Sequence, residues 1–212
     1  MLLDRPLSVV APTLDTDILP ILALTDASFT TGQLHRMLPN YSQEGIRKAL
    51  GRLVGQGVVD VESVGQAHGY RFNHEHLAAA PIVELAQMRS TLLRRLEERI
   101  TSWKVPALYA AVFGSAGRGA MHPGSDIDVL LVRPDHVGDD GDLADSWEQQ
   151  VGDLVCSVSR WTGNDTRPLQ LTHEQVRFSI STGVLGDVLR EGLTVAGRRS
   201  WLLGEIGADA QA

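Results

Sequence analysis

Residues 110–134, AAVFGSAGRGAMHPGSDIDVLLVRP, constrain the fold more than any other stretch, because a glycine-rich turn there joins two apolar runs. Residues 111–113 form a short apolar run that is typical of a buried strand. Gly114 and Ser115 end this run, and residues this small let a backbone come close to a phosphate. We expect Ser115 to cap a helix whose first N–H groups point at an anion. The turn therefore predicts a phosphate-binding position.

The second apolar run carries two acidic residues at its start. Residues 125–132, SDIDVLLV, alternate as a strand does, and a period of two puts Asp126 and Asp128 on the same face. Two neighbouring carboxylates repel each other unless a cation lies between them. Hard oxygen ligands of this kind suit Mg2+ (or Mn2+), which keeps several waters and takes further ligands from substrate phosphates. The strand therefore predicts a metal site made by Asp126 and Asp128.

Taken together, the turn and the acidic strand resemble the motif of minimal nucleotidyltransferases of the DNA polymerase beta superfamily. The residues at that family's spacing are Gly114, Ser115, Arg118, Gly119, Ser125, Asp126 and Asp128. The resemblance implies that the first five bind a nucleoside triphosphate and that the two aspartates bind Mg2+ and catalyse nucleotidyl transfer. Arg118 either pairs with a phosphate or closes the turn by binding a carbonyl. The alternative is a strand-turn-strand with a solvated acidic edge.

The same family carries a third carboxylate on a later strand, and this sequence departs from the pattern there. The corresponding strand is expected at residues 167–171, which include no Asp or Glu. We expect Gln170 to stand in the catalytic position, where a neutral amide is a weaker Mg2+ ligand and cannot act as a base. Asp165 or Glu174 would substitute only if the register were shifted by several residues.

Composition limits the class of protein. The chain has 212 residues, 43% of them hydrophobic, and a formal net charge of -7, as expected for one large or two small globular domains. Its single cysteine, Cys156, lies in an apolar helical run and is expected to be buried, in keeping with a reducing cytoplasm. The N-terminus lacks the pattern of a signal peptide, and no stretch is long enough to span a bilayer, so we expect a cytoplasmic protein without membrane contact.

The first 80 residues predict three helices followed by a hairpin. The helices are expected at residues 14–24, from a cap at Thr30 or Thr31 to residue 38, and at 42–54; the hairpin joins residues 58–62 to 70–72 around a loop at 65–69. This arrangement is similar to the winged-helix domains of bacterial transcription regulators. The resemblance implies that the third helix enters the major groove of double-stranded DNA.

Several polar residues would then face DNA. The expected contacts are Gln43, Arg47, Lys48 and Arg52 on the third helix, with Arg71 or His68 near phosphates. The alternative is that the basic residues are the solvated face of a dimerisation or protein-docking module. Six Lys or Arg against eight Asp or Glu give residues 1–80 a net charge of -2, so any DNA contact depends on local charge placement.

Residues 81–104 predict one long amphipathic helix whose apolar stripe is buried either on the following domain or against its twin in a homodimer. Beyond the motif we expect a solvated loop at 135–145, a helix at 147–161, a strand at 167–171, and a helix running from a capping box at Thr172 to Gly192.

The predicted fold class is α+β, with a winged helix-turn-helix domain (1–80), a linker helix (81–104) and a nucleotidyltransferase-like domain (105–212) in which helices flank a mixed sheet. Two functions of different class remain open. In the first, the chain transfers a nucleotide to a protein, RNA or small-molecule acceptor. In the second, it is a DNA-binding transcription regulator whose degenerate nucleotidyltransferase domain only senses a nucleotide.

Overall fold

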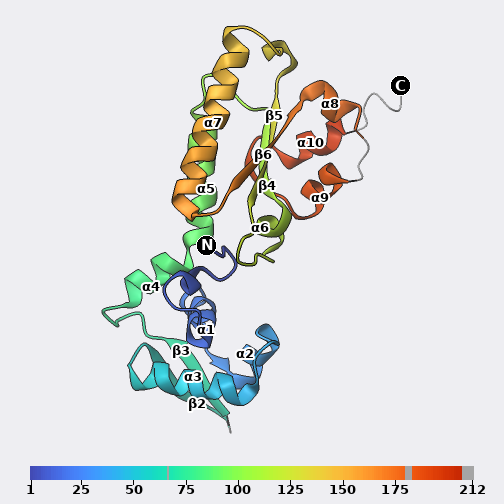
Figure 1. The fold of residues 1–212 in the computed structure, drawn as a ribbon. Helices are drawn as coiled ribbons and strands as arrows, with labels where there is room; N and C mark the ends of the chain where they lie inside the picture. The colour runs from blue at the N-terminus through green and yellow to red at the C-terminus, as the bar shows by residue number, and fades with distance from the viewer. Residues whose placement is uncertain (66, 180–182, 207–212) are drawn as a thin grey trace. The chain divides into compact units, whose positions relative to one another are not determined.

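The structure is a computed structural model that describes residues 1–65, 67–179 and 183–206 (Figure 1). The chain divides into two compact units. The N-terminal unit comprises Leu2 and residues 4–89, and the C-terminal unit comprises Met1, Leu3 and the chain from Ser90 onward. The division falls inside the segment 81–104 that the sequence predicts as a linker helix.

The N-terminal unit contains the three helices and the hairpin that the sequence predicts. Its elements are the 3-10 helix η1 (Pro6–Val9), α1 (Leu14–Ala23), β1 (Phe29–Thr30), α2 (Thr31–Met37), α3 (Gln43–Gly55), β2 (Val59–Val64), β3 (Ala67–Phe72) and α4 (Ala79–Ala86). Thr30 forms a capping box at the start of α2, and the Ser42 hydroxyl accepts a hydrogen bond from the Gly45 N–H at the start of α3. These caps explain why both helix starts were predictable.

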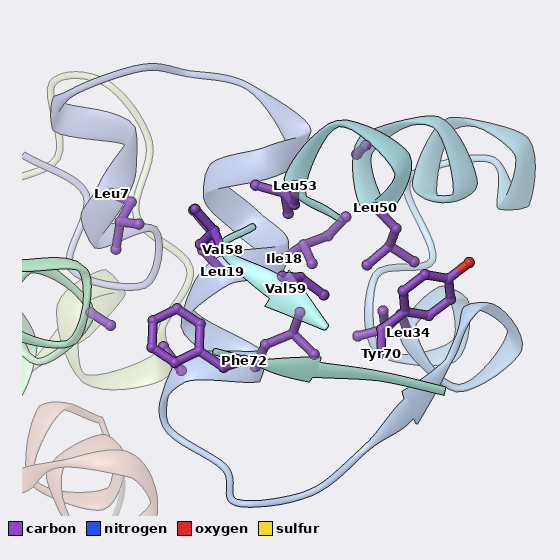
Figure 2. Close-up of a cluster of buried hydrophobic side chains, with 14 of the residues drawn as sticks. Leu7, Ile18, Leu19, Leu34, Leu50, Leu53, Val58, Val59, Tyr70 and Phe72 are labelled. Carbon is purple, nitrogen blue, oxygen red and sulfur yellow. The ribbon is translucent and has the colours of Figure 1, made fainter. Parts of the chain in front are cut away.

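The hairpin is longer than expected and belongs to a three-stranded antiparallel sheet in the order β1-β3-β2. Gln66, in the predicted loop, lies outside the described residues. Figure 2 shows the core beneath this sheet, where Ile18, Leu34 and Leu50 from the three helices meet Val59 and Phe72 from the strands. All five are buried. Burying large aliphatic and aromatic side chains on one side of a small sheet is the main source of stability for such a unit.

The single long helix predicted at 81–104 is two helices, α4 and α5 (Met88–Thr101), separated at Gln87. Neither proline nor glycine lies at this break. Ala79 and Ala86 of α4 are buried in the core of the N-terminal unit, whereas Leu92, Leu96 and Ile100 are the buried residues of α5. The two halves of the apolar stripe thus pack in different units.

In the C-terminal unit α5 packs against α7 (Asp142–Thr162). The Arg95 guanidinium lies 5.5 Å from the centroid of the Trp161 ring, and Trp103 meets Trp147 edge to face at 5.3 Å. The α5 part of the stripe is thus buried within the chain, and its burial requires no second copy. Homodimer formation therefore stays a prediction, and the apolar stripe of α5 does not support it.

The remaining elements of the C-terminal unit are the strands of a four-stranded mixed sheet and the short helices between and after them. They are β4 (Tyr109–Phe113), α6 (Gly114–Arg118), β5 (Ile127–Arg133), the 3-10 helix η2 (Asp135–Val137), β6 (Thr166–Thr172), α8 (His173–Arg177), α9 (Val184–Glu191), β7 (Leu193–Ala196) and α10 (Arg199–Glu205). The strand order is β6-β5-β4-β7, with β5 parallel to β6 and antiparallel to β4. The α+β class is confirmed, and the sheet is mixed as predicted.

Helices cover both faces of this sheet, with α5 and α7 on one side and α8, α9 and α10 on the other (Figure 1). Leu130 and Val132 of β5 belong to a buried cluster with Val176 of α8, Val188 of α9 and Leu202 of α10. Since side chains alternate along a strand, Asp128 shares the face of Leu130 and Val132. The α8–α10 side is therefore the side on which the candidate site must lie.

Several local predictions were wrong. The helix predicted from Thr172 to Gly192 is two short helices, and residues 180–182 lie outside the described residues. The predicted loop 135–145 contains η2 and the first turn of α7. Cys156 is exposed, because it lies off the buried stripe of α7 that includes Leu154 and Val158. Among the described residues, no helix combines the length and the apolar character needed to cross a membrane.

Candidate nucleotide and metal site

The site begins where β4 ends beside the start of β5. Phe113 and Asp128 are partners in the antiparallel register, so Gly114 follows directly beside the Asp128 carboxylate. Gly114 has a φ of +65°, which L side chains rarely adopt, and a Cβ built on it would overlap Asp128 Oδ2. Only glycine permits this close approach of the backbone to a carboxylate oxygen.

The carboxylate pair, Asp126 and Asp128, is held in a partly buried setting. The Asp128 pKa is raised, first by burial of its carboxyl and then by the neighbouring negative charge of Asp126. The effect of the Asp126 charge on the Asp128 pKa shows that the two carboxylates lie near each other. The positive charges of Arg167 and Arg118 act in the opposite direction and lower the Asp128 pKa.

Two arginines accompany the carboxylate pair. Arg167 Nη1 lies 3.0 Å from Asp126 Oδ2, and Arg167 is the register partner of Asp128 on the parallel strand β6. Arg118, at the end of α6, places its Nη1 3.4 Å from Glu191 Oε1 at the end of α9. Arg118 thus pairs with a carboxylate and not with the carbonyl that the alternative required.

The other predicted nucleotide-binding residues have visible structural roles. Ser115 is inside α6 rather than its cap, since the helix begins at Gly114 and its N-cap is Phe113, so the predicted cap was wrong. Gly119 ends the helix in the left-handed region with a φ of +66°. Ser125 is buried, and its Oγ accepts a hydrogen bond of 3.0 Å from the His122 N–H across a turn. Gly119 and Ser125 thus shape the loop that leads to the carboxylate pair.

The described residues of the site offer suitable donor atoms for Mg2+ but only two charged ligands. Two partly buried carboxylates lie beside a glycine whose missing side chain leaves room over an oxygen, which is a suitable donor set for a hard cation. In the part of the chain that the structure describes, however, no group of three or more His, Cys, Asp or Glu residues gathers as a metal site. The pair therefore suits one ion that takes further ligands from water and phosphate.

The prediction that Gln170 stands in the third carboxylate's place is wrong. In the parallel register Gln170 pairs with Leu131, whereas Arg167 pairs with Asp128. Residues an odd number of positions apart point to opposite faces, so Gln170 faces α7 and not the carboxylate pair. Its amide is held there, since Trp147 Nε1 donates to Gln170 Oε1 and Gln170 Nε2 donates to Glu148 Oε2 at 3.2 Å.

Replacing Gln170 by Ala is accordingly expected to lower stability without changing nucleotide binding. Trp147 is completely buried, and losing its acceptor leaves an unsatisfied indole N–H that costs about 1–3 kcal/mol. Thermal melting with and without Mg2+ and a nucleotide measures both effects. Gln170→Glu is the matched variant, because it keeps an acceptor for Trp147 but adds a charge beside Glu148. Lost nucleotide binding with an unchanged Tm in Gln170→Ala would return Gln170 to the site.

The predicted DNA-contacting residues are exposed, and their charges are already paired. Glu44 pairs with Arg47 at 2.7 Å and with Lys48 at 3.8 Å along α3. Arg52 pairs with Asp15 of α1 at 2.6 Å. Arg71 of β3 pairs with Asp26, and Gln43 is the first residue of α3. The structure therefore places Gln43, Arg47, Lys48 and Arg52 on one helix, while Arg71 lies on the hairpin.

Comparison with known proteins supports the C-terminal part of this interpretation. Residues 93–163 match the family model of the nucleotidyltransferase domain. This segment of the C-terminal unit resembles a nucleotidyltransferase domain. The matched segment covers β4, α6, β5 and α7, and thus includes Gly114 and both aspartates. It ends before β6, where this chain carries Arg167 and Gln170.

A curated relative and two solved structures also resemble the chain. A bifunctional uridylyltransferase/uridylyl-removing enzyme of Vibrio atlanticus (strain LGP32) is 40% identical over 62 residues, which are 27% of this chain and only 7% of the relative. A crystal structure of the toxin-antitoxin MntA-HpeT mutant D39ED41E has a TM-score of 0.36 at 14% identity and covers 58% of this chain and 85% of that one. A crystal structure of a toxin-antitoxin with AMP-PNP has a TM-score of 0.35 at 15% sequence identity and covers 57% of this chain and 84% of that one. Superpositions this weak add nothing to the assignment.

Sequence reasoning missed Arg167 and Glu191. Arg167 could have been found, because a strand, a long helix and a second strand in succession favour a parallel pair, and parallel strands bring their starting ends together. Asp128 lies at the start of β5 and Asp126 directly before it, so their neighbour had to lie at the start of β6. Glu191 carried no comparable signal, since its place near Arg118 depends on how α9 packs beside α6.

Proposed function

We propose that the C-terminal unit binds a nucleoside triphosphate with Mg2+ (or Mn2+) and transfers its nucleotidyl group to an acceptor hydroxyl. The observation that carries this proposal is the approach of the Gly114 backbone to Asp128 inside a segment that matches the nucleotidyltransferase domain. In such a reaction the acceptor oxygen bonds to the α-phosphorus while the bond to the leaving pyrophosphate breaks.

The residues of the chain have separable parts in this reaction. Asp126 and Asp128 would hold Mg2+, which when bound supplies positive charge for the oxygens of the α-phosphoryl group and the leaving pyrophosphate. Gly114 leaves room for a phosphate beside the carboxylate pair, and Arg118 offers a guanidinium to the phosphate chain. With no third carboxylate among the described neighbours, the acceptor hydroxyl must lose its proton to Asp126, to Asp128 or to water.

Incubation with labelled nucleotides tests this proposal. The purified chain is mixed with Mg2+ and each of the four nucleoside triphosphates carrying an α-phosphate label, and UTP is included because the curated relative is a uridylyltransferase. Label is expected on the protein itself or on added RNA, and none when the label is on the γ-phosphate. Asp128→Asn is the control. Absence of both label transfer and nucleotide binding in the wild type would contradict the proposal.

A second proposal concerns the N-terminal unit, which we propose is a winged helix that binds double-stranded DNA. The order α1-β1-α2-α3-β2-β3, with a three-stranded sheet, supports it, as does the exposed basic side of α3. A phosphate must then displace the acidic partners of the arginines, and exposed ion pairs are weak enough, at about 0–1 kcal/mol, to be exchanged. Under this proposal the chain is a regulator whose C-terminal unit senses a nucleotide.

Removing Arg47 and Arg52 together is expected to weaken DNA binding at low salt and to reduce the slope of log Kd against log salt by about two, roughly one for each lost phosphate contact. Fluorescence anisotropy with a labelled duplex measures both quantities. Arg94→Ala, which removes an exposed and ion-paired arginine of α5, is the control.

Removing the acidic partners gives the opposite test. Glu44→Gln with Asp15→Asn frees Arg47 and Arg52 and is expected to strengthen binding. If neither the wild type nor this variant binds any duplex at low salt, the N-terminal unit does not bind DNA and the docking alternative replaces it.

A further inference from the structure

Arg167 has a position that the proposed reaction does not yet explain. It is the register partner of Asp128 across the parallel pair of strands, and its Nη1 lies 3.0 Å from Asp126 Oδ2. The Arg167 side chain is 70% exposed, whereas that of Asp126 is only 21% exposed. The solvated guanidinium of Arg167 is thus paired with a carboxylate that is much less accessible than itself. That carboxylate, Asp126, is a proposed metal ligand.

We propose that Arg167 is a mobile phosphate-binding residue of the nucleotide site, held on Asp126 until a nucleoside triphosphate and a divalent ion arrive together. This inference rests on the proposed function of the C-terminal unit and adds to it a specific coupling. With no ligand, the guanidinium neutralises Asp126. With both ligands present, Asp126 would hold the ion and the guanidinium would bind the phosphates.

The exchange is physically favourable for three reasons. The Arg167 side chain is 70% exposed, so water solvates the guanidinium as it leaves Asp126, and the Asp126 carboxylate, which is only 21% exposed, gains the arriving ion as its new partner. A guanidinium binds phosphate oxygens in a bidentate geometry, so the released side chain has a good second partner. A divalent ion and a guanidinium repel each other when both approach Asp126, but a triphosphate between them carries enough negative charge to accept both.

The charges around Arg167 make it better suited to this exchange than Arg118. Arg118 is paired with Glu191, which is not part of the carboxylate pair, so a metal ion on Asp126 does not compete directly for its partner. Arg167 shares its partner with the ion. Metal ion and nucleotide therefore become linked through Arg167, and the linkage must be reciprocal.

Arg167→Gln tests this linkage by binding alone. Mn2+ is titrated into the full chain, and the free ion is measured by electron paramagnetic resonance, with and without a nucleoside triphosphate analogue that cannot be cleaved. Arg190→Gln is the matched control, because Arg190 is a 68% exposed arginine of the same unit that pairs with Asp187. Neither measurement depends on turnover.

In Arg167→Gln, Mn2+ alone is expected to bind a few-fold more tightly, because the guanidinium no longer competes for Asp126. The nucleotide analogue is expected to bind about tenfold more weakly, because a charge-assisted contact to its phosphates is lost. Arg190→Gln is expected to match the wild type. If the wild type binds Mn2+ and the analogue while Arg167→Gln changes neither affinity, or only that of the ion, this inference is overturned and the proposed function stands. If the wild type binds neither ligand, both are overturned.

Discussion

Replacing Asp126 and Asp128 together by asparagine is expected to abolish the rise in Tm that Mg2+ and a nucleoside triphosphate give the wild type. A ligand at about 100 times its Kd stabilises the folded state by roughly 2.7 kcal/mol, which corresponds to a rise of about 5–10 °C for a protein of this size. The amides keep the shape of the carboxylates but remove the charge that holds a hard cation. Differential scanning fluorimetry with each ligand alone and with both measures the effect.

Without metal or nucleotide, the same double variant is expected to be more stable than the wild type at neutral pH. Burial and the charge of Asp126 raise the Asp128 pKa, so the folded protein favours the protonated carboxyl. That contribution to stability is fully present below the ordinary carboxyl pKa and is lost as the pH rises through the raised folded value. The gain in Tm should therefore be seen at pH 7 in a chelator and shrink as the pH falls through the acidic range.

The control for both effects removes the same amount of charge elsewhere. Asp139→Asn with Asp187→Asn replaces two exposed aspartates that pair with Arg133 and Arg190. This variant should retain the full ligand-dependent rise and show no gain in stability in a chelator. A rise of wild-type size in the Asp126 and Asp128 variant would show that the nucleotide binds at another place.

The position of the carboxylate pair was predictable because it depends on local rules. Gly114 follows the apolar run that forms β4, and Asp128 is the second residue of β5, with Asp126 directly before that strand. The caps of α2 and α3 were predictable for a similar reason, since Thr30 and Ser42 act on N–H groups only three residues away. Such features survive whatever the tertiary arrangement is.

Features that depend on distant parts of the chain were not predictable. The prediction for Gln170 depended on how β6 pairs with β5, which local patterns do not reveal. In the parallel pairing Arg167 lies beside Asp128, and Gln170, three residues further along β6, points to the opposite face of the sheet. The pairing of two predicted DNA contacts was not predictable either, because Arg52 of α3 and Arg71 of β3 find their acidic partners 37 and 45 residues away in sequence. Charge patterning along one helix contains no sign of such partners.

Gly114→Ala is expected to impair the site in a way that strain alone cannot explain. The left-handed φ of +65° costs a residue with a Cβ about 1–2 kcal/mol, and the added atom would also overlap Asp128 Oδ2. The Asp128 carboxylate must then move or the turn must open. Either movement alters the geometry of the metal ligands, so nucleotidyl transfer should fall at least about tenfold, the loss expected from about 1.4 kcal/mol of transition-state stabilisation.

The matched control is Gly163→Ala at the end of α7. Gly163 has a φ of +71°, and a Cβ built there has no other atom within 4 Å, so this variant has the backbone strain without the overlap. Both variants should lower the Tm of the ligand-free protein, but only Gly114→Ala should also lose the Mg2+-dependent and nucleotide-dependent rise. Since the two substitutions differ mainly in what the new methyl group meets, the difference between them measures the contact with Asp128. Equal losses, or a full ligand-dependent rise in Gly114→Ala, would show that a nucleotide does not need the narrow approach of residue 114 to the carboxylate pair.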